Sequence, residues 1–189
     1  PDNDILLYYP ISDEYAVRGK SLLLHFDGAA KGSSVRQTAE YLFNKGYAFD
    51  YISDRQIANL QTKAGKIETG GVNYQTILLP RTKLIPIETF VKVVEMARSG
   101  ATIMMEELPQ DVPGLGHLAE RQMMLKSLIK SLNLQKGSGT MQWAKVGKGT
   151  VLVGNLSEIL TRVRIRHEIM VDHGLQCIRR VDGANTTYF

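Results

Sequence analysis

The stretch YQTILLPRTKLIPIETFVKVVEMARSGATIMMEELP, residues 74–109, predicts a β-strand, an α-helix and a second β-strand in succession. The segment from Pro86 to Gly100 has proline near its first turn, glycine at its end and one apolar side. The residues of that side are Ile87, Phe90, Val91, Val94 and Ala97. The flanking runs, 74–80 and 101–109, are short and continuously apolar, which is typical of strands buried on both faces of a parallel sheet.

The same alternation continues on both sides of this stretch. Three more apolar runs predict strands, at residues 4–10, 47–53 and 149–154. Helices are predicted to start at polar residues followed three positions later by Gln or Glu, namely Ser34, Ser53 and Asn155. Continued through Val163, this pattern predicts an α/β domain with a mostly parallel five-stranded sheet, in a flavodoxin-like three-layer arrangement.

Two segments between the strands carry predictions of their own. The polar segment 62–74, with paired glycines at Gly70 and Gly71, predicts a small hairpin. The segment 117–134 predicts a helix whose apolar stripe is Leu118, Met124, Leu125, Leu128, Ile129 and Leu132. The methionine pairs at 104–105 and 123–124 are expected to fill the core.

The pattern changes after residue 165. Residues 166–189 predict no helix, and the alternating run from Leu175 to Val181 predicts an antiparallel strand. The dipeptide Asp182-Gly183 predicts a tight turn into a return strand. We therefore expect an α/β domain at 1–165 and a β extension at 166–189, which is either an addition to the sheet edge or the first hairpin of a following β domain.

Composition excludes several classes of protein. The 189 residues suffice for one domain with a real core, and the net charge of +4 comes from scattered basic residues, which argues against nucleic-acid binding. A single cysteine, Cys177, excludes an internal disulfide framework and a cysteine-based zinc site. No apolar run approaches the ~20 residues of a membrane-spanning helix, and no signal peptide is recognisable.

Charged side chains follow the predicted parallel strands at their carboxyl ends, where open α/β sheets bind ligands. The main candidates for a crevice there are Asp13, Glu14, Asp54, Arg55 and Glu106, with Arg81, Lys83, Glu107 and Asp111 nearby. One hypothesis is a general acid/base pair among Glu14, Glu106 and Glu107. The other, which we favour, is a solvated rim that caps helices and docks against a neighbouring domain, since adjacent residues in a strand point to opposite faces.

Motifs for phosphate binding or nucleophilic catalysis are missing from the sequence. There is no G-x-G-x-x-G, no P-loop and no G-x-[SC]-x-G elbow. The glycine-bearing segments 136–140 and 147–150 are expected to be turns.

Cys177 is expected to be a structural thiol within a strand. The four histidines share no metal-ligand spacing, although His25 and Asp27 could share one side of an extended segment. The sequence therefore predicts no catalytic residue, cofactor site or metal site, and it leaves a flavin site open.

Several blocks resemble, in order, a segment of the large bacterial α-L-rhamnosidases of glycoside hydrolase family 106. The blocks are DILLYYPISDEYA (4–16), HFDG (25–28), TAEYLFNKGYAFDYISDRQI (38–57), YQTILLP (74–80), PIETF (86–90), ARSGATI (97–103) and DHGLQCIRR…YF (172–189). The resemblance covers nearly the whole chain, and GYAFDYISDRQI is its most specific part.

The resemblance implies a flavodoxin-like, amidotransferase-like accessory domain that follows a catalytic barrel and precedes β-sandwich domains. The paired glutamates and the calcium of the family belong to the barrel, so none is assigned to this chain. A similar domain in family 42 β-galactosidases helps to build trimers, which makes a homo-oligomer a hypothesis here. In those β-galactosidases the loops of the domain reach toward the catalytic site. By this resemblance we hypothesise that four residues support the residues that contact the sugar without contacting it themselves: Asp13, Glu14, Asp54 and Arg55.

On this resemblance we expect a piece of a longer, secreted or periplasmic enzyme, as the absence of an initiator Met also suggests. Residues 166–189 would then be the first hairpin of the next β domain. The leading hypothesis is a non-catalytic domain of an enzyme that removes terminal α-L-rhamnose from plant polysaccharides or glycosides, with the barrel and β domains as its partners. The alternatives are an independent module that binds a sugar or flavin in the carboxyl-edge crevice, and an amidotransferase-like or hydrolytic enzyme in its own right.

Overall fold

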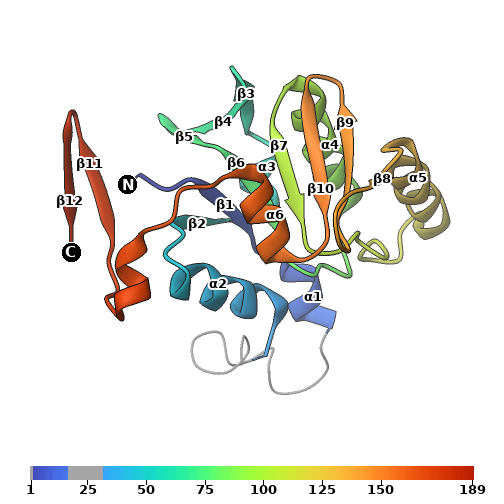
Figure 1. Cartoon of the computed structure of the whole chain (residues 1–189). Helices are drawn as coiled ribbons and strands as arrows, with labels where there is room; N and C mark the ends of the chain where they lie inside the picture. Colours follow the sequence, from blue (N-terminus) through green and yellow to red (C-terminus); the bar gives the residue numbers. More distant parts are fainter. Residues whose placement is uncertain (1, 17–31) are drawn as a thin grey trace.

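The computed structural model describes residues 2–16 and 32–189 (Figure 1). Within them, seven strands form one sheet in the order β2-β1-β6-β7-β10-β9-β8. The five predicted strands are present as parallel neighbours: β1 (Ile5–Tyr8), β2 (Phe49–Ile52), β6 (Thr76–Leu79), β7 (Thr102–Met105) and β10 (Gly149–Val153). The predicted HFDG segment, with His25 and Asp27, lies outside the described residues.

The prediction of a five-stranded sheet is wrong, because two antiparallel strands extend it beyond β10. These are β9 (Gln142–Val146) and β8 (Gln135–Lys136). The turn at Gly147, which has a φ of 59°, folds β9 back against β10. These strands lie at the edge of the sheet and are only partly buried, so they lack the continuous apolar run that marks a central strand.

Both faces of the parallel strands are covered by helices, as their sequences predict. All four residues of β1 are buried, and they alternate between two hydrophobic clusters. Ile5 and Leu7 pack with α2 (Ser34–Asn44) and α6 (Leu156–Val163), whereas Leu6 and Tyr8 pack with α4 (Ile87–Ser99). Figure 1 shows α6 in front of the sheet and α4 behind it. The domain is therefore a three-layer α/β structure.

The helix starts are close to those predicted. The capping box at Ser53 is confirmed at α3 (Asp54–Ile57), where Gln56 Oε1 accepts a 3.0 Å hydrogen bond from the Ser53 backbone N–H. Asn155 is confirmed as the cap of α6, since its side chain accepts from the Ser157 and Glu158 backbone N–H groups. The predicted start of α2 at Ser34 is confirmed, but its cap was placed one residue late, because Ser33 is the N-cap and its Oγ accepts from the Arg36 backbone N–H.

The predicted methionine packing is confirmed at one pair and wrong at the other. Met104 and Met105 are buried in β7, whereas Met123 and Met124 are 63% and 53% exposed. Both exposed residues lie on α5 (Leu118–Ser131), in which Leu125 is the buried residue. Figure 1 shows α5 at one end of the molecule, so only one side of this helix packs against the rest of the domain.

Two further segments belong to the α/β domain. The predicted small hairpin is a three-stranded sheet of β3 (Gln61–Lys63), β4 (Lys66–Thr69) and β5 (Val72–Tyr74). A short helix, α1 (Ile11–Ala16), follows β1. Among the described residues, none of the helices has the length and apolarity that crossing a membrane requires.

The C-terminal segment forms the predicted hairpin, with two corrections. Its strands are β11 (Arg179–Asp182) and β12 (Asn185–Tyr188), so the first strand is shorter than predicted and Cys177 lies outside it. The segment also contains a 3₁₀ helix, η2 (Ile169–His173), where no helix was predicted. This single turn has no buried residue and therefore no apolar stripe that a sequence pattern could show.

Candidate functional site

The five predicted site residues lie at the carboxyl edge of the parallel strands, but the structure distributes them over separate places. Asp13 and Glu14 lie on α1 after β1, Asp54 and Arg55 lie on α3 after β2, and Glu106 directly follows β7. One surface groove contains Asp54 and Arg55, and a different one contains Glu106. The predicted single crevice therefore divides into distinct sites.

Asp13 binds backbone groups of the loop that follows β6. Its Oδ2 accepts from the Lys83 N–H at 2.8 Å, and its Oδ1 accepts from the Leu84 N–H at 2.7 Å. A carboxylate that accepts two backbone N–H bonds makes strong, charge-assisted contacts. Asp13 therefore holds this loop against α1.

Glu14 is partly shielded from solvent on the same helix. Burial raises the pKa of its carboxyl above the ordinary value, a hydrogen bond with Ser33 lowers it in part, and the charge of Asp13 raises it. Glu14 therefore lies between α1 and the cap of α2, in a position where its ionised form is disfavoured.

Asp54 joins the end of β1 to the start of α4. Its Oδ1 accepts from the Tyr8 hydroxyl at 2.8 Å and from the Thr89 hydroxyl at 2.7 Å. Burial raises the pKa of Tyr8 far above its usual range, and the hydrogen bond and charge of Asp54 raise it further. A buried hydroxyl needs such an acceptor, so the Asp54 carboxylate is part of the packing. Its groove, of about 560 Å³, is also lined by Arg55 and Lys92.

Glu106 lies in the groove that we take as the candidate functional site. Its Oε1 accepts from the Thr38 hydroxyl of α2, and its Oε2 lies 3.8 Å from Arg81 Nε. Arg81 also donates to Gln37 Oε1, so β7, the loop after β6 and α2 meet here. Burial raises the pKa of Glu106 above its usual value, Thr38 and Arg81 oppose this shift, and the charge of Glu107 adds to it.

This groove has a volume of about 600 Å³ and a wall of mixed polar and apolar surface. The lining residues are Gln37, Thr38, Tyr41, Arg81, Glu106, Glu107, Thr140, Gly154, Asn155, Leu156 and Ser157. Of these, Arg81, Glu106 and Glu107 were predicted at the rim. The residues from α2 and from the start of α6 were missed, although the cap signal at Asn155 had placed the start of a helix at this edge.

The groove offers acceptors, donors and one aromatic ring. The Arg81 guanidinium is half-exposed and the Glu106 carboxylate is mostly shielded, so together they present a donor and an acceptor to a bound hydroxyl group. Glu107 supplies a second carboxylate to the wall of the same groove. Among residues 2–16 and 32–189, no group of three or more His, Cys, Asp or Glu side chains is arranged to hold a metal ion.

A comparison with one solved structure supports the fold, and a second match is weaker. A catalytic mutant of Gan42B, a GH42 beta-galactosidase from G. stearothermophilus, matches with a TM-score of 0.51 and 9% sequence identity over 95% of this chain. An apo exo-carrageenase GH42 from Bacteroides ovatus matches with a TM-score of 0.48 and 13% identity over 97% of this chain. This chain covers 32% of the first of these structures and 20% of the second.

The family comparison extends over most of the chain. A comparison with curated proteins found no match. The model of the family described as alpha-L-rhamnosidase, glycoside hydrolase family 106, matches residues 23–189. The matched range includes the groove at Glu106, the contact between Asp54 and Thr89, and the C-terminal hairpin. The chain therefore belongs to the α-L-rhamnosidase family, glycoside hydrolase family 106.

Proposed function

We propose that this chain is a non-catalytic structural domain of an α-L-rhamnosidase-type glycoside hydrolase. The observation that carries the proposal is the use of the rim carboxylates. Asp13 binds the loop after β6, and Asp54 binds Tyr8 and Thr89. Glycosidic hydrolysis needs two carboxylates on opposite sides of one bond, whereas these two are committed to packing contacts in different places.

The arrangement of the parallel strands supports a flavodoxin-like domain. Numbered along the chain, the five parallel strands have the order 2-1-3-4-5, which is that of the flavodoxin-like fold. We assign the α/β domain to residues 1–165 and the β extension, as the start of a following β domain, to residues 166–189. The proposed partners are the catalytic barrel and β domains of the parent enzyme, which would hold the calcium and bind the carbohydrate.

A turnover assay tests the proposal. The purified chain is expected to leave an aryl α-L-rhamnoside unhydrolysed, and enzyme-like turnover that Glu106→Gln abolishes would overturn the non-catalytic assignment.

In the parent enzyme, Asp54→Ala is expected to lower the thermal midpoint while kcat stays unchanged. A loss of kcat at a temperature where the variant is fully folded would contradict a purely structural role.

A second candidate function, a small-ligand module for a sugar or flavin, is favoured by the Glu106 groove. The pairing of Glu106 with Arg81 beside Tyr41 provides hydrogen-bonding groups and an aromatic ring in one concave site. Calorimetric titration with rhamnose, oligosaccharides and FMN tests it. Saturable heat that Glu106→Gln removes and Glu40→Gln preserves would support the module, because Glu40 is an exposed residue on α2 outside the groove. Flat titrations would reject it.

A further inference from the structure

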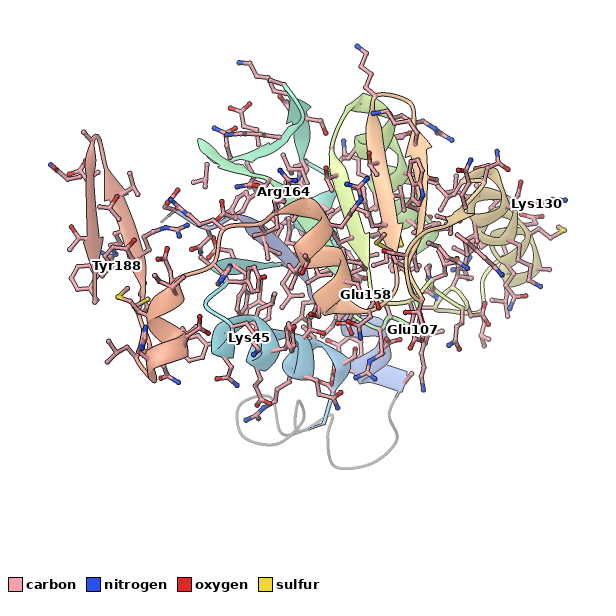
Figure 2. All side chains as sticks on the ribbon, viewed as in Figure 1. Lys45, Glu107, Lys130, Glu158, Arg164 and Tyr188 are labelled. Atoms are coloured by element: carbon pink, nitrogen blue, oxygen red, sulfur yellow. The ribbon has the colours of Figure 1, made fainter. Side chains whose placement is uncertain are left out.

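The hairpin β11–β12 is attached to the rest of the molecule through one buried arginine. Within residues 178–189, all of which the structure describes, Arg179 alone is buried, with 3% of its surface exposed. Its neighbour Arg180 is exposed, and its guanidinium lies 5.6 Å from the centre of the Phe189 ring. Figure 1 shows the hairpin at one end of the molecule beside the N-terminus, and Figure 2 labels Tyr188 on it.

The Arg179 guanidinium is surrounded by three carboxylates. Its Nε donates to Asp2 Oδ2 at 2.7 Å, its Nη2 donates to Asp4 Oδ2 at 3.1 Å, and its Nη1 donates to Glu168 Oε1. Nη2 also donates to the Asp2 backbone oxygen. A second guanidinium, that of Arg166, pairs with Asp2 from the surface. Charge-assisted bonds of this kind are strong, and the loss of one partner in a buried cluster leaves uncompensated charge behind.

The three carboxylates belong to the α/β domain and its connection. Asp4 directly precedes β1, and its Oδ1 accepts from Gln75 Nε2 at 2.8 Å beside the start of β6. Glu168 is fixed at the end of α2, because its backbone N–H donates to the Gly46 carbonyl at 2.8 Å. Its Oε2 in turn accepts from the Tyr188 hydroxyl of β12 at 3.3 Å. The cluster therefore joins the hairpin to the ends of the central elements.

Apolar packing contributes little to this attachment. The large apolar side chains of the connection and hairpin are exposed: Ile169, Leu175, Ile178, Val181, Tyr188 and Phe189. Between Glu168 and β11 the chain passes through η2 and Gly174, which has a φ of 77°. An isolated two-stranded hairpin is only marginally stable in water. The position of β11–β12 therefore depends on its contacts with the rest of the molecule.

We propose that Arg179 is a latch that fixes the orientation of the hairpin relative to the α/β domain, and that breaking it releases residues 174–189 as a unit. The sheet stays folded in the released state, because β1, β6 and β7 have their own apolar cores on both faces.

Amide hydrogen exchange on the whole chain tests the latch. Arg179→Gln is expected to speed exchange of the β11 and β12 amides by at least about tenfold, while the amides of β1, β6 and β7 keep their wild-type protection. Arg179→Lys is expected to fall between the two, since an ammonium group cannot reproduce the fork of the guanidinium. The matched control is Arg180→Gln, which removes the adjacent exposed arginine and is expected to leave the exchange of the β11–β12 amides within about threefold of wild type.

The second variant is Glu168→Gln, which keeps the size of the side chain and removes one of the three charges. It is expected to change the hairpin in the same direction by a smaller factor. Unchanged hairpin exchange in Arg179→Gln, or equal effects of Arg179→Gln and Arg180→Gln, would overturn the latch. Loss of protection in β1 and β6 together with the hairpin would overturn its independence as a unit.

Discussion

The central strand β1 and the terminal strand β12 have the same length but are held in different ways. All four residues of β1 are buried, whereas all four residues of β12 are exposed. Strand β1 has parallel neighbours on both sides and helices over both faces, while β12 pairs only with β11 among the described strands. Burial of apolar surface, worth about 25 cal/mol per Å², therefore stabilises the sheet. The hairpin depends on directed charge contacts at Arg179.

The largest expected effect comes from removing apolar volume in the sheet layer. Phe90 is fully buried between α4 and the sheet, so Phe90→Ala is expected to lower the free energy of unfolding by about 3–5 kcal/mol. Val181, which is 41% exposed on β11, is the matched control, and Val181→Ala is expected to cost about 0.5 kcal/mol. Denaturant unfolding followed by circular dichroism measures both. Equal costs would remove the contrast between the two regions.

A smaller effect is expected from the polar contact at the end of β1. Asp54→Ala leaves the buried Tyr8 hydroxyl without its acceptor, which is expected to cost about 1–3 kcal/mol. Arg55→Ala, at the adjacent exposed position, is expected to cost about 0.5 kcal/mol or less. The same unfolding measurement separates the two variants. If the Asp54 variant were as stable as wild type, the end of β1 would need no polar support.

As the pH is lowered, the amides of the hairpin are expected to lose protection from exchange at a higher pH than those of the sheet. Partial burial disfavours ionised Asp2, but the hydrogen bonds and charges of Arg166 and Arg179 prevail and lower its pKa below 3.8. The stability from this lowered pKa is complete above pH 3.8 and is lost as the pH falls through the folded-state value. Asp4 and Glu168 face the same guanidinium.

Hydrogen exchange between pH 3 and 6, corrected for its intrinsic pH dependence, checks this expectation. Protection of β11 and β12 should fall toward the acid end of this range while that of β1 persists. Asp2→Asn should remove part of the pH dependence, because it cannot be protonated. A uniform loss of protection across the chain would indicate that the hairpin and the sheet respond to acid together.

The same contrast explains how much could be predicted from the sequence. Strands such as β1 and β6 and helices such as α4 bury side chains at fixed local spacings, and those spacings are visible in the sequence. The edge strands β8 and β9 and the turn η2 bury little, so they left no comparable pattern. Where burial is low, local sequence carries little information about structure.

The candidate site was predictable only in its location. The rule that parallel strands end at one edge placed Asp13, Asp54 and Glu106 correctly at that edge. Their partners are set by tertiary packing: Asp13 contacts a loop about 70 residues away, and Arg179 contacts Asp2 from 177 residues away. No local spacing encodes contacts of that range, so neither the division of the crevice nor the arginine cluster was predicted.

The smallest expected effect concerns Glu106, whose ionic contact is intermediate between the two regions. Its partner Arg81 is half-exposed and lies 3.8 Å away, and such pairs contribute at most about 1 kcal/mol. Burial raises the pKa of Glu106, so ionising it works against folding, and the penalty grows as the pH rises above 4.5.

Glu106→Gln keeps an acceptor for Thr38 and removes that penalty. At pH 7 the free energy of unfolding of the variant should therefore lie within about 0.5 kcal/mol of the wild-type value. At pH 4, where wild type does not pay the penalty, the variant should be less stable relative to wild type than it is at pH 7. Denaturant unfolding at both pH values measures the difference. A cost near 2 kcal/mol at pH 7 would mean that the Glu106 carboxylate is held as tightly as those around Arg179, and that charge contacts support the sheet layer as well as the hairpin.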